Sequence, residues 1–218
     1  IFVVGMSIGI AGSWIVLSES AWGYMQEQAD QDTWDLRVDL TSPLPNENVT
    51  SMLDIGGAEY TIPFAYLAGQ ISGGGKSENT YIVTSDRMLE TRDFELESGE
   101  LDLSTSVLTN KLASELGISV GDRIVIRVGA REMETTIGGI VYDILMQAVY
   151  MDRDTASPLV DENMANGAFI KLVDKEEAEA ISDDLEDLEG VSRVTIQDDI
   201  IEAMDDTFGS AMSLLYIF

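Results

Sequence analysis

Both ends of the chain are apolar runs without charge, whereas polar and apolar positions alternate in the sequence between them. Residues 1–18 are mostly aliphatic, and a helix of that length spans roughly 27 Å, close to the hydrocarbon thickness of a bilayer. Gly5, Gly9 and Ser13 recur every four residues and form a stripe at which a second membrane helix can pack closely. We therefore expect residues 1–33 to contain the end of a transmembrane helix and a stalk that extends it.

The C-terminal end repeats this pattern, because residues 207–218 are uncharged and follow an acidic segment. We expect residues 198–218 to form a second stalk and the start of a second transmembrane helix. No Lys or Arg precedes Arg37, which favours an extracytoplasmic location for the domain between the two spans. For residues 1–18, the alternatives are a cleaved signal peptide, whose basic start is missing, and a helix buried in a soluble core.

The middle of the chain reads as a mixture of strands and helices. Trp34–Leu40 alternates as a half-buried strand does, and Pro43 and Pro45 are expected to end it. Further strands are predicted at 60–71, 80–84, 123–128, 133–142, 148–151, 168–173 and 191–196. A short helix is predicted at 46–53, and a strand end followed by a short helix at 106–116, with Gly117 as C-terminal cap.

A helix with a regular apolar face is predicted from Asp174 to Gly190, where it ends. Asp174 and Glu177 have the spacing of an acidic capping box at its start. The strands on either side of this helix complete a β-α-β unit. A long helix from Asp198 then leads toward the membrane.

A glycine-rich segment, Gly73-Gly74-Gly75-Lys76-Ser77, resembles a phosphate-binding loop. The motif requires a Gly five positions before Gly75, where this chain has Gln70, and a helix after the loop, where this chain has a strand-like run. We therefore expect a flexible hairpin tip.

Composition narrows the possible functions further. The chain has 40 acidic and 12 basic residues and a net charge of -28, which excludes a nucleic-acid surface and adsorption to anionic lipids. Such an acidic surface also indicates adaptation to high salt, in an archaeal organism, with an ordinary acidic protein as the alternative. The chain has no Cys and no His, so thiol nucleophiles, imidazole bases and ordinary zinc sites are excluded.

No catalytic, cofactor or metal site is predicted. Asp152-Arg153-Asp154 begins like a calcium loop, but Ala156 occupies the next ligand position and the required Gly is absent. Asn48-Val49-Thr50 is a glycosylation sequon, which makes Asn48 a candidate modification site.

Three segments resemble the MacB/FtsX-type ABC transporter permeases. Residues 107–124 are similar to the family's strand followed by LA-x-x-LG-x-x-VGD-x-I. Residues 137–143 resemble the V-x-GIV-x-D strand that follows it there, and residues 174–194 resemble its helix with GV-x-x-V. The order of these segments, with apolar runs at both ends, covers nearly the whole chain.

The resemblance implies an α+β fold with a bipartite extracytoplasmic domain. A porter-like β-α-β subdomain would combine residues 34–90 and 158–197. A mainly-β, sabre-like subdomain would be inserted at 91–157. Stalk and transmembrane helices at 1–33 and 198–218 would flank both parts.

The function implied by the resemblance is mechanical coupling without catalysis. A cytoplasmic ATPase subunit would drive the membrane helices, and a second permease copy would complete a dimer in the membrane. The outcome would be export, handling of lipoproteins or lipids, or mechanical signalling, and the substrate stays open. The alternatives are a membrane-anchored extracellular binding protein and an extracellular hydrolase, and the latter has no nucleophile–base pair to support it.

Overall fold

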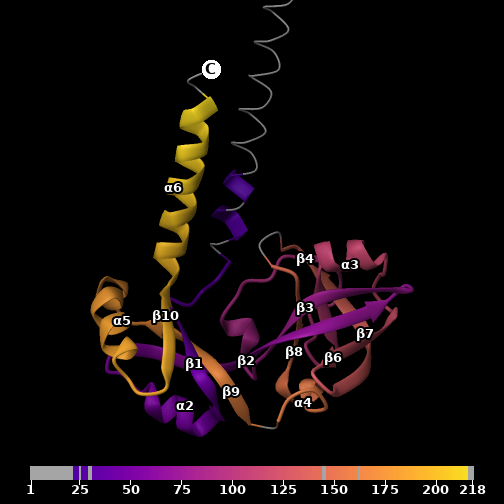
Figure 1. Ribbon diagram of the computed structural model, residues 1–218, viewed down its shortest axis with the longest axis horizontal. Helices are drawn as coiled ribbons and strands as arrows, with labels where there is room; N and C mark the ends of the chain where they lie inside the picture. The colour runs from indigo at the N-terminus through magenta and orange to yellow at the C-terminus, as the bar shows by residue number, and fades with distance from the viewer. Residues whose placement is uncertain (1–21, 25, 29–30, 144–145, 162, 216–218) are drawn as a thin grey trace, which may run out of the picture.

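The computed structural model describes residues 22–24, 26–28, 31–143, 146–161 and 163–215. They form two lobes that share one long strand, with a helix rising from one of them (Figure 1). This helix, α6 (Gln197–Leu215), runs alongside the helical residues 22–24 and 26–28. The arrangement is a mixed α/β fold.

The first lobe is a four-stranded antiparallel sheet in the order β10-β1-β9-β2. Its strands are β10 (Val191–Ile196), β1 (Leu36–Pro45), β9 (Met164–Leu172) and the first half of β2 (Ala58–Gly73). Side chains of α2 (Asn46–Met52) and α5 (Ala178–Glu186) pack on this sheet and complete its core. Since β9 and β10 both pair with β1 and α5 connects them, the predicted β-α-β unit is confirmed.

The prediction that Pro43 ends the first strand is wrong, because β1 continues to Pro45, which is its last residue. Its pairing with β9 shifts register between Asp39 and Leu44, and then resumes as Leu44 opposite Ala165. Pro43 falls inside this irregularity, where no ladder hydrogen bond from its nitrogen is needed. A proline at a bulge is therefore compatible with a strand that the same proline would end elsewhere.

The second lobe is a closed ring of six strands. Its strand pairs connect the second half of β2 to β3, β8, β5, β7, β6 and back to β2. These strands are β3 (Lys76–Thr84), β8 (Ala148–Met151), β5 (Ser106–Thr109), β7 (Arg131–Val141) and β6 (Arg123–Val128). A further strand, β4 (Leu96–Gly99), pairs with β7. Closure removes most of the unpaired edges that an open sheet of this size would expose.

The interior of this barrel is apolar and receives side chains from all six strands. Residues of α3 (Asn110–Leu116) and of the segment around α4 (Arg153–Ala156) join the same core. The fully buried members from the strands are Ile71, Ile82, Leu108, Ile124, Ile126, Ile137, Val149 and Met151. Alternate residues of each strand point inward, which is the pattern that a small barrel requires.

Several local predictions are confirmed. Gly117 follows α3 with a φ of 70° and closes it as a left-handed cap. Gly74 and Gly75 both have positive φ and turn β2 into β3, so the glycine-rich segment is a hairpin tip and not a phosphate-binding loop.

The predicted capping box is wrong. Asp174 caps a short 3-10 turn, η2 (Lys175–Glu177), by accepting a hydrogen bond from the Glu176 backbone N–H at 3.0 Å. The helix α5 begins only after this turn, and Glu177 makes no side-chain cap. The strand β4 and the helix α4 have no counterpart in the prediction.

The hairpin of β2 and β3 lies within the predicted first porter-like segment, residues 34–90, yet it pairs with strands of the barrel. The division into porter-like and sabre-like parts stays a prediction. Among the described residues, no helix combines the length and apolar character needed to cross a membrane. The first predicted transmembrane helix, with Gly5, Gly9 and Ser13, lies outside the described residues.

Three strands of the first lobe, β1, β9 and β2, approach closely at Gly167 in the middle of β9. A Cβ atom there would clash with the ring of Phe64 and with the Val38 carbonyl. Phe64 is fully buried and lies on β2 just before that strand passes into the barrel. Packing at this position therefore requires a residue without a side chain.

Candidate functional site at the base of α6

The segments that enter and leave the domain are tied together at the base of α6. The backbone N–H of Gln197 donates to the Asp35 carbonyl at 3.0 Å, and its side-chain amide donates to the Asp32 carbonyl at 2.7 Å. The entering segment is also held to residues 91–93, since Thr33 N–H donates to the Thr91 carbonyl at 3.0 Å. Hydrogen bonds therefore hold the entering segment to the start of α6 and to residues 91–93.

Arg92 connects this junction to the barrel. Its guanidinium lies 3.3 Å from an Asp32 carboxylate oxygen and 3.1 Å from one of Asp143, which follows β7. The hydroxyl of Tyr150, on β8, donates to the same Asp143 oxygen at 3.3 Å. Arg92, Asp143 and Tyr150 are all buried. A charge taken out of water requires partners of this kind, so the network is a specific link and not a surface pair.

Burial perturbs the ionisation of this cluster. It raises the pKa of Asp32 to about 6, although the nearby Arg92 guanidinium acts in the opposite direction. Burial likewise raises the pKa of Tyr150, so its hydroxyl stays protonated and acts as a donor. Burial alone would lower the pKa of Arg92, but Tyr150, Asp32 and Asp143 outweigh it and raise the pKa, so Arg92 keeps its charge.

The raised pKa predicts a pH effect on stability. Between the ordinary value of 3.8 and about 6, the folded chain binds a proton at Asp32 more readily than the unfolded chain. The stabilisation from this proton is full below 3.8 and is lost as the pH rises through 6. Relative to Asp32→Asn, which keeps an acceptor for Arg92, the wild type should therefore lose up to about 3 kcal/mol between pH 4 and 7. Urea denaturation at several pH values measures this difference, and a constant difference would contradict it.

The two helical segments above the junction contact each other side by side (Figure 1). Trp22 stacks on Phe208 of α6, with ring centroids 4.8 Å apart, and the Gln26 side-chain amide donates to Asp205 at 3.2 Å. Each segment also contacts a different lobe. The ring of Tyr24 lies 5.8 Å from that of Tyr142 in the barrel lobe, whereas Lys175 of the first lobe pairs with Asp198 of α6 at 2.7 Å.

A cavity of about 300 Å³ lies below α6, between the lobes, and we call it the α6 cavity. Four aromatic residues, Trp34, Tyr66, Tyr150 and Phe169, form part of its wall, and Ile200 and Ile201 of α6 also line it. Asp32 and Arg92 of the buried network line it as well. The cavity therefore touches both lobes and the helix.

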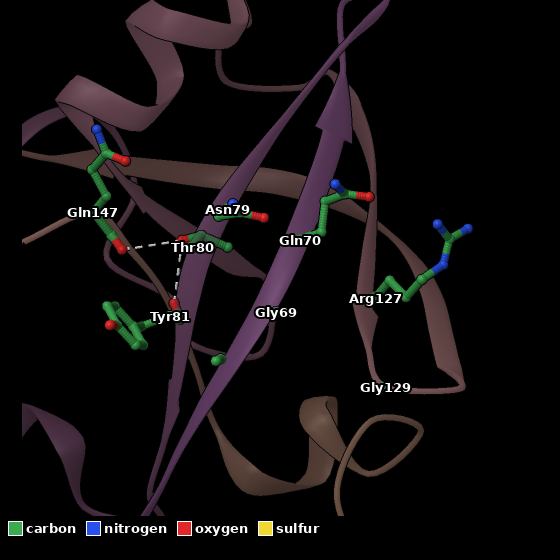
Figure 2. Close-up of a pocket in the computed structure, with 9 residues that line it drawn as sticks. Gly69, Gln70, Asn79, Thr80, Tyr81, Arg127, Gly129 and Gln147 are labelled. Carbon is green, nitrogen blue, oxygen red and sulfur yellow. Dashed lines mark hydrogen bonds between the residues drawn. The ribbon is translucent and has the colours of Figure 1, made fainter.

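A second hollow of about 600 Å³ lies on the barrel, over β2 and β3. Figure 2 shows Gln70, Asn79 and Gln147 around it, with the Thr80 hydroxyl donating to the Gln147 carbonyl at 3.1 Å. Arg127 at its edge pairs with Glu132. The lining is uncharged apart from this arginine, and it contains no pair of groups arranged for acid–base chemistry.

The remaining candidate residues lie away from both places. Asn48 is exposed on α2, and its glycosylation stays a prediction. The Asp152 side chain caps α4 by accepting from the Thr155 N–H at 2.7 Å. Within the described part of the chain, no group of three or more acidic residues could hold a metal ion.

Sequence reasoning did not find the network of Asp32, Arg92 and Asp143. The available signal was an Arg in a chain with few basic residues, close to the start of a predicted inserted segment. Asp143 is the last residue of the segment that resembles the permease family. Neither signal indicates that the side chains of Arg92 and Asp143 meet.

Comparison with known proteins assigns the chain to a family. A family model described as the MacB-like periplasmic core domain matches residues 1–188. The chain belongs to the MacB-like periplasmic core domain family. No curated protein matches the chain.

Two solved structures share the fold of this MacB-like core domain. One is the periplasmic region of MacB from Actinobacillus actinomycetemcomitans, with 14% identity, a TM-score of 0.56, and coverage of 80% of this chain and 94% of that one. The other is the extracellular domain of the noncanonic ABC-type transporter YknZ from Gram-positive bacteria. It shows 8% identity, a TM-score of 0.54, and coverage of 74% and 98%.

The expected resemblance is thereby confirmed: the chain is a MacB-like domain of an ABC transporter permease. Membership implies an extracytoplasmic position on a membrane protein and a membrane-associated ATPase as partner. The chain is homologous to a non-catalytic periplasmic domain of an ABC transporter permease.

Proposed function

We propose that this domain couples ATP hydrolysis by a cytoplasmic ATPase subunit to movement outside the membrane. The observation that supports the proposal is the junction at the base of α6. There the segments entering and leaving the domain are hydrogen-bonded to each other and, through Arg92, to the barrel. A relative movement of the two helical segments would reach both lobes through these contacts.

The proposal includes the division into parts that the resemblance implies. Residues 34–90 and 158–197 would act as the porter-like part and residues 91–157 as the sabre-like part. Residues 1–33 and 198–218 would be the stalks and membrane helices. A second permease copy would complete the assembly, which would serve export, lipoprotein or lipid handling, or mechanical signalling.

Cross-linking the two helical segments tests the coupling. Gln26 and Asp205 already contact each other, and the chain contains no Cys, so Gln26→Cys with Asp205→Cys introduces a unique pair. In the assembled permease, a short bis-methanethiosulfonate linker should reduce steady-state ATP hydrolysis by at least about tenfold, because a conformational step limits such cycles. Binding of ATP should be retained, and a reducing agent should restore turnover.

The matched control is a pair that the same reagent joins within a rigid element. Ser72 and Ser77 face each other across the β2–β3 hairpin, with their hydroxyl oxygens 2.8 Å apart. Cross-linking Ser72→Cys with Ser77→Cys should leave ATP hydrolysis unchanged. Unchanged hydrolysis after joining positions 26 and 205 would reject coupling and favour the membrane-anchored binding protein instead.

A further inference from the structure

The α6 cavity has an aromatic wall that is fixed by packing. Trp34 stacks on Phe169 at 5.5 Å between ring centroids, and Phe169 lies 4.4 Å from Phe64. The ring of Tyr66 stacks on that of Tyr81, with the ring centroids 4.7 Å apart. Rings that are held in place before a ligand arrives lose little conformational freedom on binding. The wall is therefore a preformed surface for an apolar group.

The charges around the cavity leave one positive group uncompensated. Asp32 pairs with Arg92, and Asp39 pairs with Arg37 at 2.8 Å. Arg193, the fifth charged residue of the lining, is exposed and lies opposite Asp39 in the strand register.

Arg193 also differs from the other arginines of the chain. In the described residues, every other arginine makes an ion pair, and Arg193 makes none. Acidic partners are abundant in a chain with a net charge of -28, so an arginine left without one is unusual. A guanidinium in this state is available to a carboxylate from outside the chain.

We propose that the α6 cavity binds a small amphipathic anion, a single apolar chain or ring that carries one carboxylate. The apolar part would lie against Trp34 and Phe169, and the carboxylate would reach Arg193. A volume of about 300 Å³ is at the lower end of the range that holds small-molecule ligands, and it is too small for a lipid with two acyl chains. The inference does not depend on the proposed coupling function.

A charge series of probes tests the ligand class. Decanoate, decanol and decyltrimethylammonium share the same apolar chain and differ in charge. In the full chain with Trp14→Phe and Trp22→Phe, Trp34 is the remaining tryptophan and reports on the cavity. Decanoate, kept below its micellar concentration, should change the Trp34 fluorescence saturably and bind at least about tenfold more tightly than the other two, which corresponds to one charge-assisted contact.

Variants locate the two parts of the site. Arg193→Gln should weaken decanoate binding about tenfold and leave decanol unaffected, because only the carboxylate contact is lost. Ile200→Glu, at an exposed position of the lining, should weaken the binding of both. Arg123→Gln is the control, since Arg123 is an exposed arginine on the barrel that pairs with Glu134.

Two results would overturn the proposal. Equal affinity for the three probes, or a signal that does not saturate, would mean nonspecific adsorption to apolar surface. An unchanged decanoate affinity in Arg193→Gln, with Arg123→Gln behaving the same way, would mean that Arg193 does not receive the anion.

Discussion

Arg92→Met is expected to destabilise the chain by about 3–5 kcal/mol, because it leaves the buried carboxylate of Asp143 and the half-buried carboxylate of Asp32 without their guanidinium. Methionine retains most of the apolar stem, so the effect reports the charge and its hydrogen bonds rather than lost volume. The free energy of unfolding from urea denaturation at neutral pH is the measurement.

Arg87→Met provides the comparison for this prediction. Arg87 lies five residues earlier and forms an exposed ion pair with Glu90 within one turn. An exposed pair of this kind contributes at most about 1 kcal/mol, so Arg87→Met should be close to the wild type. If the two variants unfold at the same urea concentration, then Arg92 is not the connection between the junction and the barrel.

Phe64→Ala is expected to cost about 3–5 kcal/mol, the range for removing a fully buried aromatic side chain. Phe64 is 0% exposed, lies 4.4 Å from Phe169, and has the Arg37 guanidinium 5.2 Å above its ring. Its loss opens a void where β2 passes from the first sheet into the barrel. Leu89→Ala, at a 3-10 turn where the side chain is 48% exposed, should change stability little.

The close approach of Phe64 to Gly167 makes this prediction sharper. Gly167→Ala alone should be destabilising, because its new methyl group would meet the Phe64 ring and the Val38 carbonyl. In the double variant, Phe64→Ala with Gly167→Ala, the Phe64 ring is absent, so the new methyl group at position 167 has space where the ring lay. The combined loss should therefore be smaller than the sum of the single losses. Strict additivity would show that the two positions do not share a packing contact.

The variants at Phe64, Gly167 and Arg92 separate apolar packing within the first sheet from a polar link to the barrel. Phe64 and Gly167 pack against each other in the first sheet, just before β2 passes into the barrel, whereas Arg92 lies in a polar network near the base of α6. A coupling element requires contacts that transmit displacement, and buried polar networks have discrete arrangements that suit this role. The proposed function therefore predicts that Arg92→Met impairs coupling more than Phe64→Ala does, even if both substitutions lower the free energy of unfolding equally.

Much of the local structure was predictable because it depends on neighbouring residues. Period-two alternation predicted β6 at its observed bounds, the strand expected at 191–196 is β10, and a single glycine predicted the end of α3. The glycine-rich run predicted a hairpin tip, and the structure places Gly74 and Gly75 there, both with positive φ. The failures are local rules that a neighbouring segment overrode. Pro43 did not end β1, since β9 resumes pairing beyond it.

The sequence by itself indicated the class of the protein, through short segments with the spacing of the permease family in a chain without Cys or His and with a net charge of -28. Only the tertiary structure decided that six strands close into a barrel, since β3 pairs with β8 and β5 with β7 across long separations. It also decided that Arg92 meets Asp143 and that Arg193 stays without an ion pair in the described residues. The physical reason is that periodicity reports the environment of one segment, whereas pairing and charge neutralisation depend on which distant segment lies opposite.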